Sequence, residues 1–125
     1  MTTALIRRLA DGDNSPDVFQ WMAQAAKKYL RGETIDTALG LDRSSLLRER
    51  NAALYRAADL LDRGGGPWCT AGLLAASIKR FENRMLQLYR RGLAEPSPVD
   101  QALIDAFATG QRIPKTQRKL YDILR

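Results

Sequence analysis

The side chains of this chain that could do chemistry are mainly cationic, and they gather near predicted helix starts. The sequence contains 20 lysine and arginine residues against 14 acidic residues, and no histidine. The chain therefore lacks an imidazole for acid–base catalysis, for a Ser-His-Asp triad or for a metal site. No nucleophile–base pair or ligand cluster replaces it, so we expect no enzyme, cofactor or metal chemistry. The basic excess favours an acidic partner, most commonly nucleic acid.

A first cationic cluster lies in residues 34–50, which read TIDTALGLDRSSLLRER. Thr34 suits the cap of a short helix, Gly40 suits its left-handed end, and a second helix opens two residues later. This pattern resembles the helix-turn-helix DNA-binding motif, whose second helix presents its first side chains to the major groove. The resemblance implies contacts from Arg43, Ser44, Ser45, Arg48 and Arg50. The alternative is a glycine-terminated helix followed by a capped one, as in any helical bundle.

A second cationic cluster has the same order of helix, glycine turn and helix in residues 98–124. Ser97 is expected to cap a helix over residues 98–108, Gly110 to end it, and a last helix to begin at Pro114. The polar or cationic candidates here are Arg112, Lys115, Thr116, Gln117, Arg118 and Lys119. The alternative is a solvated basic tail whose apolar residues pack on the bundle.

A third set follows one face of a predicted central helix. Arg80, Arg84 and Arg91 are spaced by four and seven residues, which places them on one side. Such a stripe can follow a phosphate backbone, and we include Arg80 and Arg84 among the candidate nucleic-acid contacts. The exposed side of an ordinary amphipathic helix has the same composition.

Helices must position these clusters, because no alternating apolar pattern predicts a strand. Leu74, Ile78, Phe81, Met85 and Leu88 recur at steps of four and three, which predicts a long central helix over residues 67–91. Further helices are expected at about residues 4–10, 16–30, 34–39, 43–62, 98–108 and 114–124. The prediction is an all-α, compact, single-domain bundle of about six helices around the central one, spanning residues 1–125. The glycines at 64–66 form either a tight hairpin or a hinge.

The basic excess is uneven along the chain. Residues 1–66 carry ten basic and nine acidic side chains, and residues 67–125 carry ten and five. We therefore expect a small nucleic-acid-binding protein, a helix-turn-helix-like regulator or accessory factor that binds duplex DNA, and a homodimer is compatible with that mode. The alternative is a helical adaptor or inhibitor that binds an acidic protein surface. One cysteine, no long apolar run and no signal peptide favour a cytoplasmic protein without a membrane partner.

Overall fold

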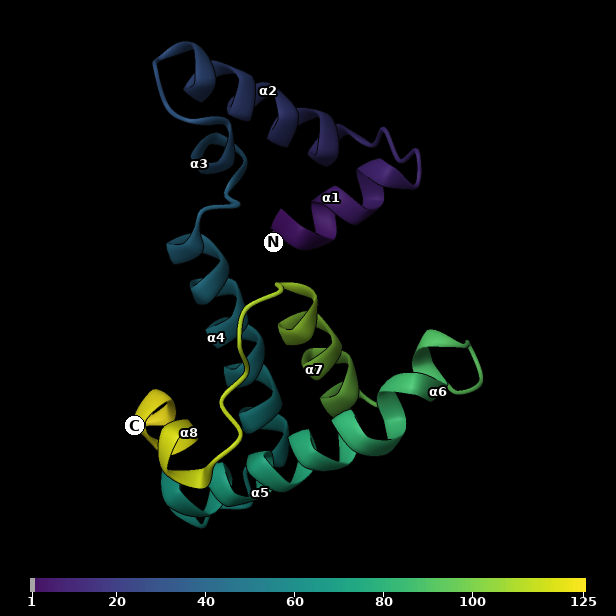
Figure 1. The fold of residues 1–125 in the computed structure, drawn as a ribbon, viewed down its shortest axis with the longest axis vertical. Coiled ribbons are helices and arrows are strands. Elements are labelled where there is room, and N and C mark those ends of the chain that lie inside the picture. Colours follow the sequence, from purple (N-terminus) through teal and green to yellow (C-terminus); the bar gives the residue numbers. More distant parts are fainter. Residues whose placement is uncertain (1) are drawn as a thin grey trace. The chain divides into compact units, whose positions relative to one another are not determined.

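The computed structural model describes residues 2–125, which contain helices and no strand (Figure 1). The elements are α1 (Thr2–Ala10), α2 (Pro16–Leu30), α3 (Ile35–Leu39), α4 (Arg43–Leu61), α5 (Gly66–Arg80), the π-helical turn η1 (Phe81–Met85), α6 (Leu86–Arg90), α7 (Pro98–Ala108) and α8 (Gln117–Leu124). The predicted all-α class is confirmed. None of the helices in the described residues is long and apolar enough to cross a bilayer.

The chain divides into two compact units, Met1–Glu49 and Arg50–Arg125, which we call unit 1 and unit 2. The division falls inside α4. The glycines at 64–66, where the sequence allowed a hinge, lie inside unit 2 and join α4 to α5. Gly64 and Gly66 have φ of +82° and +88°, a conformation that side chains with a Cβ rarely adopt. The single domain over residues 1–125 stays a prediction.

Unit 1 contains α1, α2, α3 and the start of α4. Two hydrogen bonds tie α1 to α4: the backbone N–H and the hydroxyl of Thr3 donate to the Glu49 carboxylate at 3.1 and 2.6 Å. Thr34 caps α3, and Gly40 ends it at φ +76°, as predicted. A Cβ at Gly40 would lie 2.7 Å from the Thr2 hydroxyl oxygen, so both conformation and space require glycine there.

Helix α2 begins at Pro16, as predicted, and the residue before it is a serine, a type that often caps helices. The Ser15 side chain makes no capping bond, because its hydroxyl donates to the Asp13 carboxylate instead. The Arg8 guanidinium donates to Asp13 at 2.8 Å and to Asp17 at 2.6 Å. The hydrogen bond from Ser15, followed by that from Arg8, lowers the pKa of Asp13 to about 2. A network between α1 and α2 therefore replaces a local cap.

We expect this network to make stability depend on acid. Because the pKa of Asp13 is lower in the folded chain than in the unfolded one, its contribution is present above pH ~4 and is lost as the pH falls towards 2. The melting temperature of Asp13→Asn should therefore lie below that of the wild type at pH 6, and the gap should close between pH 4 and pH 2. Thermal unfolding followed by circular dichroism measures the gap. A gap that stays constant over this range contradicts the assignment.

Unit 2 contains nearly all of the buried apolar residues. Its core consists of Ala53, Leu54, Ala57, Ala58, Ala71, Leu74, Ile78, Phe81, Ala102, Leu103, Ala106, Ile113 and Leu120. The Phe81 ring lies 5.2 Å from the Phe107 ring and 6.1 Å from the Tyr89 ring, measured between centroids. These residues come from α4, the central helix, α7, the segment before α8 and α8 itself. They give unit 2 a packed interior that holds its surface groups in place.

The central helix is continuous from Gly66 to Arg90, close to the predicted residues 67–91, but it contains a π-helical turn. A π turn holds more residues than an α turn, so the strict spacing of the apolar residues does not hold beyond Phe81. Met85 is half-buried and Leu88 is 38% exposed, although the pattern placed both inward. Figure 1 shows the helix changing direction between α5 and α6, as expected at a π turn.

Candidate nucleic-acid interface

The second cationic cluster is divided between the non-helical segment before α8, which carries Arg112 and Lys115, and the start of α8, which carries residues 116–119. After α7, Gly110 adopts φ +71°, and α8 begins only at Gln117. The predicted start at Pro114 is therefore wrong by three residues. The physical reason is the cap: the Thr116 hydroxyl accepts a hydrogen bond from the Lys119 backbone N–H at 3.3 Å, whereas a helix starting at Pro114 would have Ile113, which has no side-chain acceptor, at its cap. The element is consequently not a tight helix-turn-helix.

Contacts within unit 2 hold this segment in place. The Arg50 guanidinium donates to the Arg112 carbonyl oxygen at 2.7 Å, and Ile113 is only 5% exposed. The Gln117 amide donates to the Trp68 carbonyl oxygen at 2.9 Å. A Cβ at Gly72 would lie 2.8 Å from the Gln117 amide nitrogen, so this glycine leaves room for the Gln117 side chain where it bonds to Trp68. The cations between these anchor points are therefore presented on a fixed backbone.

Two neighbouring pockets form one surface feature, which we call the basic groove. A pocket of ≈ 370 Å³ is lined by Glu82, Phe107, Gln111, Arg112, Ile113, Pro114, Lys115, Thr116 and Lys119. A pocket of ≈ 410 Å³ is lined by Ala75, Ala76, Ile78, Lys79, Glu82, Asn83 and Lys115. Lys115 and Glu82 line both pockets and form an ion pair at 2.8 Å. The groove therefore runs past this ion pair, from α5 and η1 to the start of α8.

The basic groove carries more positive charge than its one acid offsets. Lys79, Arg112 and Lys119 are exposed, and no hydrogen bond or ion pair involves their side chains within residues 2–125. Glu82 is already engaged by Lys115. The first turn of α8 lies beside the pocket at Thr116, and its unpaired N–H groups add positive potential. The arrangement can hold anions such as phosphates or carboxylates.

Several predicted contact residues have other partners in the structure. Gln117 is used for the bond to Trp68 described above, and Arg118 lies 3.6 Å from Asp122 one helical turn away. Arg80 lies 3.4 Å from the buried carboxylate of Asp100, which also accepts a hydrogen bond from the Tyr89 hydroxyl. Gln117 and Arg80 thus connect elements of unit 2, Arg118 pairs only within α8, and none of the three lines the basic groove.

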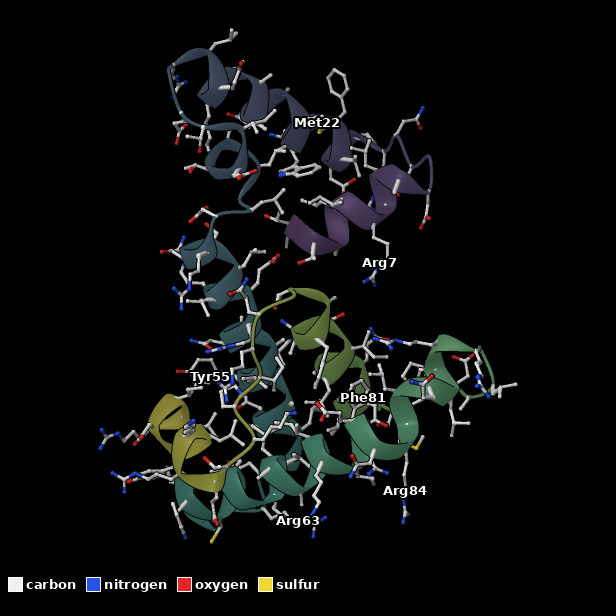
Figure 2. The ribbon with its side chains drawn as sticks, viewed as in Figure 1. Arg7, Met22, Tyr55, Arg63, Phe81 and Arg84 are labelled. Carbon is white, nitrogen blue, oxygen red and sulfur yellow. The ribbon has the colours of Figure 1, made fainter. Side chains whose placement is uncertain are left out.

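Arg84 is exposed but lies away from the groove. Figure 2 shows Phe81 directed towards α7 and Arg84 on the opposite side of the helix. The π turn between Arg80 and Leu86 changes the angular spacing on which the predicted stripe depended. The structure therefore does not gather the stripe residues with the second cluster.

The first cluster divides between the two units. In unit 1, Asp42 caps α4 by accepting hydrogen bonds from the Ser45 backbone N–H and hydroxyl at 3.1 and 2.7 Å, and Arg48 donates to that hydroxyl at 3.1 Å. Arg43 and Ser44 are exposed.

Arg50 belongs to unit 2, where burial lowers the pKa of its guanidinium and its donors are used by Arg112 and Asn51. The predicted helix, glycine turn and helix are present, but α3 has five residues and α4 has 19. Of the predicted contact residues, Ser45 is therefore engaged by Asp42 at the start of α4, and Arg50 is engaged by the Arg112 carbonyl oxygen.

Three groove residues were missed as site residues: Lys79, Glu82 and Asn83. In the sequence they lie beside the predicted arginine stripe, 29 to 33 positions before Arg112, the first candidate of the second cluster. The Lys115–Glu82 ion pair is the contact that joins the two regions, and local spacing carries no signal for it.

The distribution of charge between the two units also favours unit 2 as the location of the interface. Residues 1–49 carry seven basic and seven acidic side chains, and residues 50–125 carry thirteen and seven. All of the net charge of +6 therefore resides in unit 2, with the basic groove. No protein-family model, curated protein or solved structure matches this chain.

Proposed function

We propose that this protein binds duplex DNA through the basic groove of unit 2. It would act by occluding the bound DNA or by recruiting other molecules to it, and not by catalysis. The observation that supports this best is the set of three unpartnered cations, Lys79, Arg112 and Lys119, around one continuous groove. Cations on a fixed backbone bind a phosphate chain without the entropy cost of ordering a loop. The site also lies in the unit that holds the whole basic excess.

The groove would contact phosphates and position the protein on the duplex. Lysine and arginine contacts of this kind give affinity and association rate without sequence readout. The Lys115–Glu82 ion pair lines both pockets of the groove, with the free cation Lys79 of α5 in one pocket and Arg112 and Lys119 in the other. Because the free cations line two pockets and not one, the arrangement favours a chain of phosphates over one compact anion.

A second candidate function is binding to an acidic surface of another protein. The specific observation in its favour is that the groove already holds one carboxylate, that of Glu82, at 2.8 Å from the Lys115 ammonium. An aspartate or glutamate side chain of a partner would meet the remaining cations in the same way.

Binding to random-sequence duplex DNA at two salt concentrations tests the proposal. If three phosphates are neutralised, affinity should fall about 40-fold between 50 and 200 mM salt, from a slope of about 0.9 per phosphate. Fluorescence anisotropy of a labelled duplex measures this, and poly-glutamate at equal charge concentration is the competitor that represents an acidic protein surface. Absence of duplex binding at 50 mM salt overturns the proposal. Competition by poly-glutamate as strong as that of unlabelled duplex favours the second candidate.

A further inference from the structure

Unit 1 exposes an apolar surface, which we call the α2 face. It comprises Phe19, Met22, Ala26, Tyr29 and Leu30 of α2 and Ile35 of α3. Leu30 is 83% exposed, Phe19 73% and Ile35 59%. Burial of such apolar side chains is favourable by about 25 cal/mol for each Å² of surface removed from water.

The α2 face contains a shallow pocket and not only projecting side chains. A pocket of ≈ 260 Å³ lies between α2 and α3, and only apolar and aromatic residues line it, among them Met22, Tyr29, Ile35 and Leu39. A pocket beside projecting aromatic and aliphatic side chains is the shape that accepts a partner's side chains. Apolar patches that persist on a surface mark interaction sites.

Unit 1 buries very little apolar surface by itself. Among residues 2–49 the buried apolar residues are Val18, Ala25 and Ala38, two of which are alanines. Units of about this size are marginal without a partner, a metal or a disulfide. The described residues hold no disulfide, because Cys69 is a free thiol of unit 2. Burial of the α2 face would therefore add a large fraction of the apolar contact that unit 1 lacks.

The charges of unit 1 favour a second copy of the same chain as the occupant. Unit 1 has no net charge, so two copies can meet there without the repulsion expected between two copies of unit 2.

The two ends of α2 also differ in sign. Lys27, Lys28 and Arg31 lie at its C-terminal end, and Asp11, Asp13 and Asp17 lie at its N-terminal end. When Glu33 and Asp36 are counted at the C-terminal end, that end is still net positive. When Arg7 and Arg8 are counted at the N-terminal end, that end is still net negative. Figure 2 shows Arg7 directed away from α2.

We propose that the α2 face is a homodimer interface, in which α2 packs antiparallel against α2 of a second copy about a two-fold axis. An antiparallel arrangement places the basic end of each α2 beside the acidic end of the other, which is favourable in both places at once. Phe19, Met22, Ala26 and Tyr29 follow one another at steps of three, four and three, the spacing of a helix–helix seam. The small side chain of Ala26 near the centre lets the helices approach, and Phe19 of one copy packs near Leu30 of the other.

The dimer does not rest on the proposed function. It uses unit 1, and the basic groove uses unit 2. If both hold, one dimer carries two grooves, and the second contact to a DNA strengthens the first by raising the effective concentration. If the groove binds no nucleic acid, the dimer is unaffected.

Sedimentation velocity of the full chain between 1 and 100 μM tests the interface. The wild type should approach twice the chain mass of 14.0 kDa as concentration rises. Phe19→Glu and Leu30→Glu should each raise the dissociation constant about tenfold or more, because each places a charge in the interface twice. Both positions are mostly exposed in the single chain, so helicity by circular dichroism should not change.

Leu93→Glu is the matched control, since Leu93 is 67% exposed but belongs to unit 2. This variant should dimerise as the wild type does. A wild type that remains monomeric at 100 μM overturns the proposal, and it also means that any cover on the α2 face comes from elsewhere. Equal dissociation of Leu93→Glu and Leu30→Glu overturns it as well.

Cross-linking in a Cys69→Ser background tests the antiparallel orientation, because Cys69 is the only cysteine of the sequence. Ala26→Cys lies near the centre of the seam and should form a disulfide dimer under mild oxidation. Phe19→Cys should not, because antiparallel pairing separates the two copies of this residue by about 16 Å along the helix axes, at 1.5 Å per residue. Efficient cross-linking through Phe19→Cys indicates parallel helices and contradicts the orientation.

Discussion

Replacement of Phe81 by alanine is expected to lower the free energy of unfolding of unit 2 by about 3–5 kcal/mol. The Phe81 side chain is fully buried, and its ring contacts Phe107 of α7 and Tyr89 of α6. Truncation removes the apolar transfer energy and leaves a cavity at the junction of the central helix and α7. Domains of this size are stable by about 5–15 kcal/mol, so the loss is a large part of the total.

Urea unfolding followed by far-UV circular dichroism measures this loss on the full chain. Leu93→Ala is the control, because truncation of a side chain that is 67% exposed should change stability by about 0.5 kcal/mol or less. Phe81→Leu retains much of the buried volume and should fall between the wild type and Phe81→Ala. A loss under 1 kcal/mol in Phe81→Ala would show that the interior around η1 is not packed as described.

Reversal of the two free cations beside α8, in the double variant Arg112→Glu with Lys119→Glu, is expected to weaken binding to duplex DNA about 100-fold near 50 mM salt. Each reversal removes one cation from a phosphate and adds a repulsion at the same place. The slope of log affinity against log salt should also fall by about 1.8, because two phosphates are no longer neutralised and each accounts for about 0.9. Neither side chain has a partner within unit 2, so folding should be unaffected.

The double variant Arg43→Glu with Arg48→Glu is the matched control for charge. It changes the net charge by the same amount, but at the first turns of α4 in unit 1, where acidic side chains suit a helix N-terminus. It should bind DNA within about threefold of the wild type and keep the salt slope, because the slope reports the number of neutralised phosphates. Equal losses in the two variants would mean that only net charge matters. A larger loss in the control would assign the contacts to the helix-turn-helix-like cluster.

Local sequence features were enough to predict most helices and several of their ends. Thr34 and Ser97 cap α3 and α7, and Gly40 ends α3 in the left-handed region, all as expected. These interactions join residues three or four positions apart, so they are written in the sequence. Two starts depart from the local pattern in different ways. Helix α2 begins at Pro16 as expected, but the Ser15 hydroxyl donates to Asp13 and does not cap it. The last helix begins three residues after Pro114, behind the cap at Thr116.

The grouping of the cations could not be predicted in the same way. Local spacing places Arg112 and Lys115 in a helix-turn-helix-like element, and it places Lys79 next to the arginines of the predicted central helix. The structure joins them because Lys115 reaches Glu82 and because Arg50 fixes the Arg112 carbonyl group, contacts that span 33 and 62 positions. The same reach takes Arg50 and Gln117 out of the candidate set, since their donors are used inside unit 2.

Periodicity, caps and charge are properties of neighbouring residues, so they predict that this chain is helical, where most helices lie and that most of its candidate site residues are cations. The π turn after Arg80, the basic groove of unit 2 and the exposed α2 face of unit 1 are visible only in the folded chain. A groove or an exposed face depends on contacts between distant segments, which local patterns do not contain. Whether a side chain is free to bind a partner depends on all the contacts that the folded chain makes.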